Sequence, residues 1–223
     1  MTRQSVLLGG VEVPIIVSQV LPGLPVKVER KLQFARGPGV SRRTRVIDTL
    51  VMHWTGAENP ATTVFQTLTE RTLGVEFIVD RDALVWQCCD PLILNAHDCG
   101  GTWDARSASF EIVNAGDSSS PQWRSARNRE REEEHWAWGT VSEVTSSSFF
   151  EEQVHVVVSL ILTITKHLGI SRDVCTLARK LDPYEQANWQ GGIVGHMHFS
   201  KKGKRDPGLP LMQRIAAELE AAA

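Results

Sequence analysis

The longest apolar stretch of the chain constrains its fold more than any other feature. Residues Val154–Ile164 are apolar apart from His155, Ser159 and Thr163, and a helix around them is expected to begin at the capping-box pattern Ser148–Glu151 and to stop at Gly169. The stretch is too short to cross a bilayer, which takes about 20 residues. A helix that is apolar nearly all round has to be buried, so we expect it to lie against a β-sheet.

Strand-like and helix-like segments alternate in the rest of the chain. The expected strands are residues 46–53, 75–79, 84–88, 109–114 and an apolar run from 192, and the further helices are residues 59–72, 172–181 and 210–222. Residues 80–83 are expected to form a hairpin turn. This order predicts the α/β class: a single domain with a central mixed β-sheet flanked by helices.

The prediction of domains has three parts. Residues 1–44 are expected to be an N-terminal extension packed on the domain, with short strands such as Val11–Val17, and residues 45–223 form the domain. A polar insertion is expected at about residues 117–148, where the charge run Arg127–Glu134 predicts a solvated helix face. The tryptophans of this insertion either line a groove or pin it to the body, and we favour pinning; they are Trp123, Trp136 and Trp138.

Composition excludes several classes of protein. With 42% hydrophobic and 22% charged residues the chain is typical of a globular domain, and a net charge of -2 argues against a nucleic-acid partner. Its four cysteines form no CxxC pair, so we expect reduced thiols. We expect no transmembrane segment and no signal peptide, and therefore synthesis in the cytoplasm. We also expect a monomer.

His53 is the first candidate functional residue. It ends an apolar strand and precedes Trp54, Thr55 and Gly56. Side chains at the end of a buried strand, just before a glycine-containing loop, are where α/β proteins place reactive groups. The alternative is that His53 caps the strand with a hydrogen bond to the backbone, and the two interpretations have similar weight.

The segment Gly192–Gly208 supplies further candidates. His196 and Asp206 offer a nitrogen and an oxygen ligand for a divalent metal, and Pro207 followed by glycine predicts a turn that brings the segment back on itself. His198 is a rival ligand, because alternation along a strand would put it on the same face as His196. The alternative is an ordinary strand that runs into a polar surface loop.

Glu111 is a carboxylate inside an apolar strand, which is costly unless it is partnered. Simple alternation would instead place it on a solvent face. In a mixed sheet the strand ends that carry His53, Glu111 and His196 could converge on one edge.

Four ordered motifs together resemble the type-2 N-acetylmuramoyl-L-alanine amidase family, the zinc amidase fold also used by peptidoglycan recognition proteins and phage lysins. The resemblance covers about residues 45–215. The motifs are residues 51–56, the hairpin 77–83, the segment 96–100 followed by 107–114, and Gly195-His196 through Lys204 to Gly208.

The resemblance implies a catalytic zinc site and a reaction, the hydrolysis of the amide between N-acetylmuramic acid and L-alanine in peptidoglycan or muropeptides. It implies that Zn²⁺ is bound by His53, His196 and Asp206, with the register favouring His196 over His198. It also implies that Glu111 is the general base and that Lys204 stabilises the oxyanion. The expected substrate contacts are His97, Trp54 and Asn114.

The chain departs from the family pattern at three places. Val75-Glu76 stands where many relatives have Tyr-His or Ser-His, Ser109 replaces a common glycine, and Asp82-Ala83 replaces Asp-Gly. These changes are expected to alter the shape of the cleft and to leave the zinc site intact.

Alternative functions differ in substrate and in chemistry. The same fold could serve as a non-catalytic peptidoglycan-binding module, or an unrelated zinc hydrolase could act on another amide. Within the amidase interpretation, the chain could be a phage-type lysin that acts on the cell wall, or a cytoplasmic enzyme that recycles anhydro-muropeptides.

Overall fold

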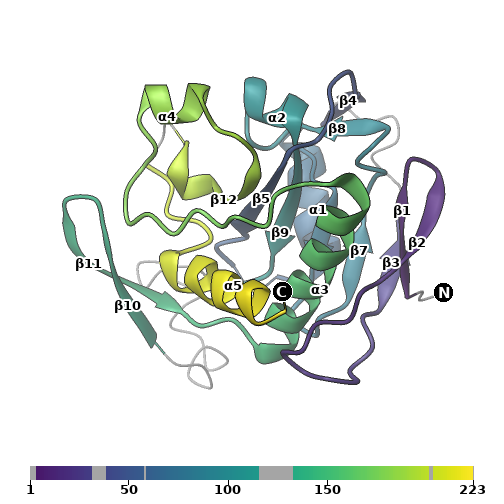
Figure 1. Ribbon diagram of the computed structural model, residues 1–223, viewed down its shortest axis with the longest axis horizontal. Coiled ribbons are helices and arrows are strands. Elements are labelled where there is room, and N and C mark those ends of the chain that lie inside the picture. The colour runs from purple at the N-terminus through teal and green to yellow at the C-terminus, as the bar shows by residue number, and fades with distance from the viewer. Residues whose placement is uncertain (1–3, 32–38, 58, 116–132, 201–202, 223) are drawn as a thin grey trace.

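A six-stranded mixed sheet forms the centre of the computed structural model, which describes residues 4–31, 39–57, 59–115, 133–200 and 203–222 (Figure 1). The strand order is β12–β5–β9–β6–β7–β3, and only the β6–β7 pair of this sheet is antiparallel. The strands are β3 (Val28–Arg30), β5 (Thr49–Trp54), β6 (Phe77–Val79), β7 (Val85–Gln87), β9 (Ser107–Ile112) and β12 (Gly192–Gly195). The predicted fold class is confirmed.

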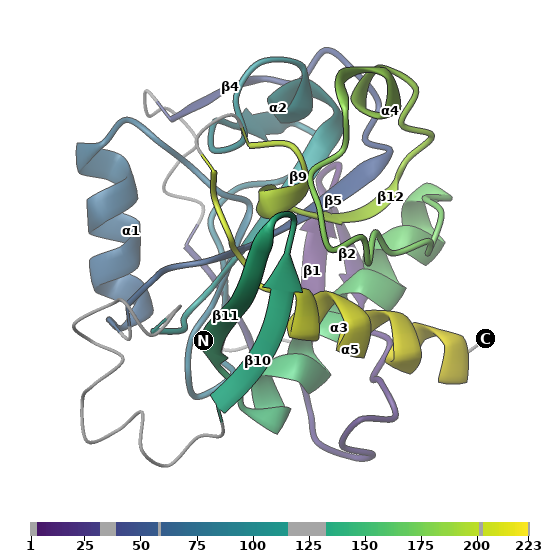
Figure 2. The same ribbon diagram turned by 90° about the vertical axis from the view of Figure 1, so that its left-hand side faces the viewer.

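Helices cover both faces of the sheet, with α1 on one side and α3 and α5 on the other (Figure 2). The helices are α1 (Ala61–Glu70), α2 (Thr102–Arg106), α3 (Glu151–Leu168), α4 (Pro183–Ala187) and α5 (Leu209–Ala221), and His196–His198 form the 3-10 turn η4. Three two-stranded pairs lie outside the main sheet: β1 (Ser5–Leu8) with β2 (Val11–Pro14), β4 (Val40–Arg42) with β8 (Leu94–Ala96), and β10 (Glu133–Trp138) with β11 (Val141–Ser147).

The apolar helix is buried as predicted. Residues 153–165 of α3 are buried without interruption, and the helix ends at Gly169 with φ +68°. The N-cap residue is Phe150, two residues later than the expected Ser148. Gln153 is the third residue of the helix, and its Oε1 accepts the N–H of Phe150 at 3.2 Å. The same side chain donates to the Val113 carbonyl at 2.8 Å, which ties the helix start to the sheet. Among the described helices, none combines the length and the apolar character that a membrane span requires.

Two polar residues inside α3 anchor the start of the chain. The hydroxyl of Ser159 accepts the N–H of Ser18 at 2.9 Å, and that of Thr163 accepts the N–H of Ile16 at 2.8 Å. Both hydroxyls also donate to carbonyls one turn earlier in the helix, so they are fully used. His155 joins this contact, with its Nδ1 3.0 Å from Ser18 Oγ.

The predicted hairpin turn is present between β6 and β7. Ala83 closes it by donating its N–H to the Asp80 carbonyl at 3.0 Å, and it adopts a φ of +61°. This is the left-handed region that glycine reaches most easily, which accounts for the glycine of the usual Asp-Gly turn.

The segment 172–181 is not a helix, and that prediction was wrong. Val174 instead forms a parallel bridge with Ile193, and the N–H of Cys175 donates to the Ile193 carbonyl at 2.8 Å. Residues 174 and 175 pair with the edge of β12, and this pairing determines the structure of the segment in place of its helical sequence pattern. The helix begins later, at Pro183, where Asp182 caps it by accepting the N–H of Glu185 at 2.8 Å.

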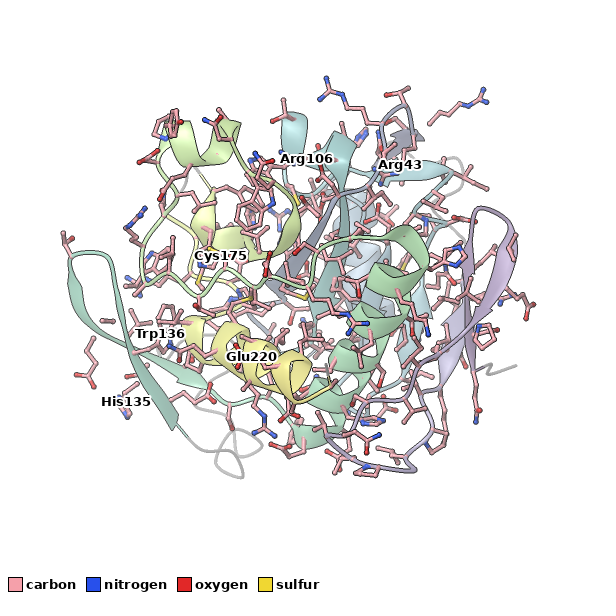
Figure 3. The ribbon with its side chains drawn as sticks, in the orientation of Figure 1. Arg43, Arg106, His135, Trp136, Cys175 and Glu220 are labelled. Carbon is pink, nitrogen blue, oxygen red and sulfur yellow. The ribbon has the colours of Figure 1, made fainter. Side chains whose placement is uncertain are left out.

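The expected insertion contains a β-hairpin, which the sequence analysis missed. Glu133 and Glu134, the end of the charge run, lie in β10 and not in a helix; residues 127–132 and Trp123 lie outside the described part of the chain. Trp136 and Trp138 lie two residues apart on β10 and both pack into the core, where each is 7% exposed. The prediction that the tryptophans attach this segment to the body of the domain is confirmed for these two. Figure 3 shows Trp136 where the hairpin meets the start of α5.

Candidate metal centre and adjoining pocket

Alternation along the central strands places two candidate side chains on one face. Leu50 and Met52 of β5 pack into the core with α3, so His53 belongs to the opposite row, and Glu111 follows the same rule on β9. His53 and Glu111 are register partners across the two parallel strands. Glu111 therefore lies beside His53 and is partly buried, so the structure favours a partnered carboxylate over the alternative of an open solvent face.

Three ligand atoms converge at the end of β5. Asp206 Oδ2 lies 3.2 Å from His53 Nδ1 and 3.1 Å from His196 Nδ1, and the two imidazole rings meet edge to face with 4.5 Å between their centroids. His53 is 3% exposed and Asp206 is 4% exposed. The structure thus brings together the residues predicted as zinc ligands.

The loop after β12 doubles back, as the Pro-Gly turn predicted. The N–H of Met197 donates to the Asp206 carbonyl at 2.8 Å, which sets His196 against Asp206. Gly195 makes this approach possible, because a Cβ there would lie 2.8 Å from Pro207 Cδ.

His198 occupies a different environment from His196. The two residues form a 3-10 turn rather than a strand, so the argument from alternation was wrong. The Nδ1 of His198 accepts the N–H of Gly195 at 3.1 Å, and its Nε2 donates to the Leu177 carbonyl at 3.0 Å. Burial lowers the pKa of His198 to about 4, so the ring is neutral. Both ring nitrogens are used, and no lone pair is left for a metal.

The charges of the three converging groups suit a cation. Burial opposes ionisation of Asp206, but hydrogen bonds from His196 and His53 outweigh it and hold its pKa well below the ordinary value. Burial also opposes the charge on His53, yet Asp98 and Asp206 raise its pKa well above the ordinary value. Burial and the neighbouring His53 lower the pKa of His196. The surrounding carboxylates therefore favour positive charge at this position, which is what the binding of a metal ion requires.

Glu111 has a pKa close to neutrality. Its pKa is raised to about 8, mainly by burial and also by Asp206 and Asp98, while His53 and Lys204 oppose the shift. A bound divalent cation would lower this pKa, because it favours the carboxylate. A carboxyl group in this range can both accept and return a proton near pH 7.

An open pocket of about 430 Å³ adjoins the cluster. Asp206 forms part of its wall together with Trp54, Thr55, Gly56, Gly203, Lys204 and Arg205. The predicted residues Trp54 and Lys204 thus face one cavity with a metal-ligand candidate. Arg205, Thr55, Gly56 and Gly203 had not been predicted as site residues.

The other two predicted substrate contacts do not line this pocket. The ring of His97 turns to β4, where Nε2 lies 2.8 Å from Ser41 Oγ. Asn114 is fully buried, with its Nδ2 3.3 Å from the Ser148 carbonyl that accepts its hydrogen bond. A side chain enclosed in this way holds a loop in place.

Sequence reasoning missed a second set of groups around His53. Asp98 Oδ2 lies 3.1 Å and Cys99 Sγ 3.5 Å from His53 Nε2, the nitrogen that faces away from Asp206. The polar, glycine-containing loop after β8 carried a sequence signal for these two residues, but only His97 was predicted from it. All four cysteines are free, as expected.

Two overlapping groups of side chains could hold a metal ion, and they share His53. A neutral imidazole has one lone pair, so His53 serves one of the two groups as a ligand and keeps a proton toward the other. His53, His196 and Asp206 give two nitrogens and one oxygen at the pocket wall, the donor set of a catalytic zinc site with an open position. The residues present fit Zn²⁺.

The fold and site define a mixed α/β domain with a candidate metal centre at the rim of an open pocket. The family model described as N-acetylmuramoyl-L-alanine amidase matches residues 43–209, and the chain belongs to this family. No curated protein sequence gave a match.

Solved structures share the fold at low sequence identity. A mutant endolysin from Bacillus subtilis has a TM-score of 0.55 at 17% identity over 87% of this chain and 99% of its own. The catalytic domain of XlyA has a TM-score of 0.54 at 16% identity, over 86% and 98%. The N-acetylmuramyl-L-alanine amidase AmiD from E. coli, in complex with an anhydro-muramic acid tripeptide, has a TM-score of 0.52 at 18% identity, over 77% of this chain; the chain spans 57% of the AmiD chain.

Proposed function

We propose that this protein is a zinc-dependent N-acetylmuramoyl-L-alanine amidase that hydrolyses the bond between N-acetylmuramic acid and L-alanine in peptidoglycan. Family membership supports the reaction class. The observation that carries the proposal is the convergence of His53 Nδ1, His196 Nδ1 and Asp206 Oδ2 beside Glu111.

The metal would be held by His53, His196 and Asp206. Zn²⁺ in such a site supplies Lewis acidity, which lowers the pKa of water to about 7 and polarises a carbonyl group. The buried carboxylate of Asp206 contacts both imidazoles, so the ligands are positioned before any ion arrives. This preorganisation avoids the cost of assembling the site on binding.

Glu111 is assigned the proton transfers. It would accept a proton as water attacks the amide carbonyl, and it would return that proton to the nitrogen of L-alanine as the C–N bond breaks. Its position in register with His53 places it next to the proposed metal ligands, and burial raises its pKa toward the neutral range in which a proton can be both accepted and returned.

Lys204 and Trp54 are assigned to the substrate side of the pocket. The ammonium group of Lys204 would stabilise the negative charge that develops on the amide oxygen. Trp54 is partly exposed in the pocket wall and offers an apolar face to the substrate next to polar groups. The side chains of both residues share the pocket with Asp206, where the reacting bond would lie.

The test combines metal analysis with product analysis. The purified protein is stripped with a chelator, reloaded with zinc, and incubated with intact sacculi and with soluble muropeptides side by side. We expect one zinc per chain, and mass spectrometry should show free stem peptides and intact sugars. The ratio of the two rates distinguishes a lysin from a recycling enzyme.

Three outcomes would contradict the proposal. Zinc-free protein that stays inactive after reloading would remove the metal from the mechanism. Binding to cell walls with no new L-alanine amino termini would identify a non-catalytic module. Cleavage at a different amide would identify another zinc hydrolase.

A further inference from the structure

The carboxylate at the far nitrogen of His53 is not used by the mechanism above. Asp98 Oδ2 lies 3.1 Å from His53 Nε2 in an ion-pair contact, and the side chain of Asp98 is 6% exposed. In the part of the chain that the structure describes, this buried oxygen has no hydrogen-bond partner, so His53 is the charged group that it faces. We propose that Asp98 is a positioning residue, which keeps the proton of His53 on Nε2 and leaves the Nδ1 lone pair for zinc. The proposal rests on the proposed zinc function.

The chemistry of the imidazole ring gives the reason. A neutral ring carries one proton, and the partner of each nitrogen decides where that proton resides. Asp206 Oδ2 lies 3.2 Å from Nδ1 and also attracts the proton, which would block the metal. A second carboxylate at Nε2 counters this attraction, because an ionised carboxylate only accepts hydrogen bonds.

The loop that carries Asp98 is held in a fixed conformation. The Oδ1 of Asp104 accepts three successive backbone N–H groups, from Asp98 at 3.3 Å, Cys99 at 2.9 Å and Gly100 at 2.8 Å. A carboxylate on such a loop has little freedom to leave the ring. It can therefore fix the orientation of His53 as well as its tautomer.

Cys99 offers a matched control, because its Sγ lies 3.5 Å from the same nitrogen. A thiol is a weak hydrogen-bond acceptor, so it cannot replace the carboxylate. If the loop acted as a ligand set for a second ion, Cys99 would matter as much as Asp98. Comparison of the two residues separates a positioning role from metal ligation.

The experiment measures zinc affinity by competition with a chelator for the whole chain and for Asp98→Asn, Asp98→Ala and Cys99→Ser. We expect the two Asp98 variants to bind zinc about 10–100-fold more weakly. Cys99→Ser should bind zinc as the parent does. In the zinc-loaded parent, proton NMR should show a downfield His53 Nε2–H signal that moves upfield in both Asp98 variants. Circular dichroism confirms folding, and the alanine variant serves if the asparagine variant does not fold.

The outcomes are distinct. Unchanged zinc affinity and an unchanged Nε2–H signal in the Asp98 variants would overturn the inference while leaving the amidase proposal intact. Equal losses in the Asp98 and Cys99 variants, or a second zinc that both remove, would replace positioning by ligation. A parent protein that binds no zinc would overturn the proposed function itself.

Discussion

Two buried polar clusters occupy the same sheet and differ in how their atoms are satisfied. In the first, which we name the closed cluster, Glu76 Oε1 accepts from Arg43 at 3.2 Å and from the Ala96 N–H at 3.1 Å. Glu76 Oε2 accepts both the N–H and the hydroxyl of Ser109 at 2.8 Å. Arg43, labelled near β4 and β8 in Figure 3, also donates to the carbonyls of three residues: Leu94, Ala105 and Ser107.

The second cluster, His53, His196 and Asp206, is open. Both imidazole Nδ1 atoms converge on Asp206 Oδ2 within 3.2 Å, and Asp206 also lines the pocket. A buried network whose donors and acceptors match holds the structure together, whereas metal-ligand atoms that converge beside a pocket mark a place for a cation. Each prediction below changes a residue of one cluster or of the site beside it, and compares zinc binding with turnover or with stability.

Removal of a ligand from the open cluster should have the largest effect on turnover. Asp206→Ala or His53→Ala deletes a donor, so we expect both the bound zinc and the amidase activity to be lost. Metal analysis and a muropeptide assay measure the two effects. A His198→Ala variant should keep its zinc, and loss of zinc there would contradict the assignment of His196.

Glu111→Gln should lower turnover by about 10²–10⁴-fold, because an amide cannot carry the proton. Zinc content should stay at the parent level, since the side chain keeps its shape beside His53. The measurement is kcat on muropeptides together with metal analysis. Near-normal activity would show that another group is the base.

Lys204→Met should have a smaller effect, about 10²-fold on kcat, because one charge that stabilises the oxyanion is removed. The side chain is exposed at the pocket, where solvent screens its field, so zinc affinity should not change. Lys204→Arg is the matched control and should recover part of the rate. If KM alone changed, Lys204 would bind substrate and not the developing charge.

Glu76→Gln should affect turnover least and stability most. It leaves the buried guanidinium of Arg43 without its counter-charge, which costs about 3–5 kcal/mol of unfolding free energy. Denaturant unfolding measures this loss, and zinc affinity serves as the second readout. The double variant Arg43→Met with Glu76→Gln should recover part of the stability, and a loss of zinc in either variant would show that the clusters are coupled.

The fold could be predicted from the sequence wherever the local pattern of a segment determines its structure. The buried helix α3, the hairpin at Asp80–Ala83 and the strand that ends at His53 each follow from apolar periodicity and turn residues. The segment 172–181 failed, because the edge of β12 recruits it through hydrogen bonds that no local pattern reveals. The β10–β11 hairpin did carry a signal, the alternation of Trp136 and Trp138 before Gly139.

The candidate site shows the same limit. His53, His196 and Asp206 could be selected from residue type and motif order, but Asp98 could not, because its role depends on how the loop after β8 folds over β5. Two departures from the family pattern, Glu76 and Ser109, proved to be hydrogen-bonded partners. Such compensation is invisible when positions are considered one at a time.

The tie between Met197 and Asp206 has a mechanical consequence. It makes the segment from η4 to the start of α5 a single loop that bears two of the three metal donors, and the third sits on the central sheet. An ion bound there would connect the sheet to the loop, so metal binding and the free energy of unfolding are thermodynamically linked. Depletion of zinc should therefore make the chain near Gly203 more susceptible to a protease, and protection should return as the free zinc concentration rises.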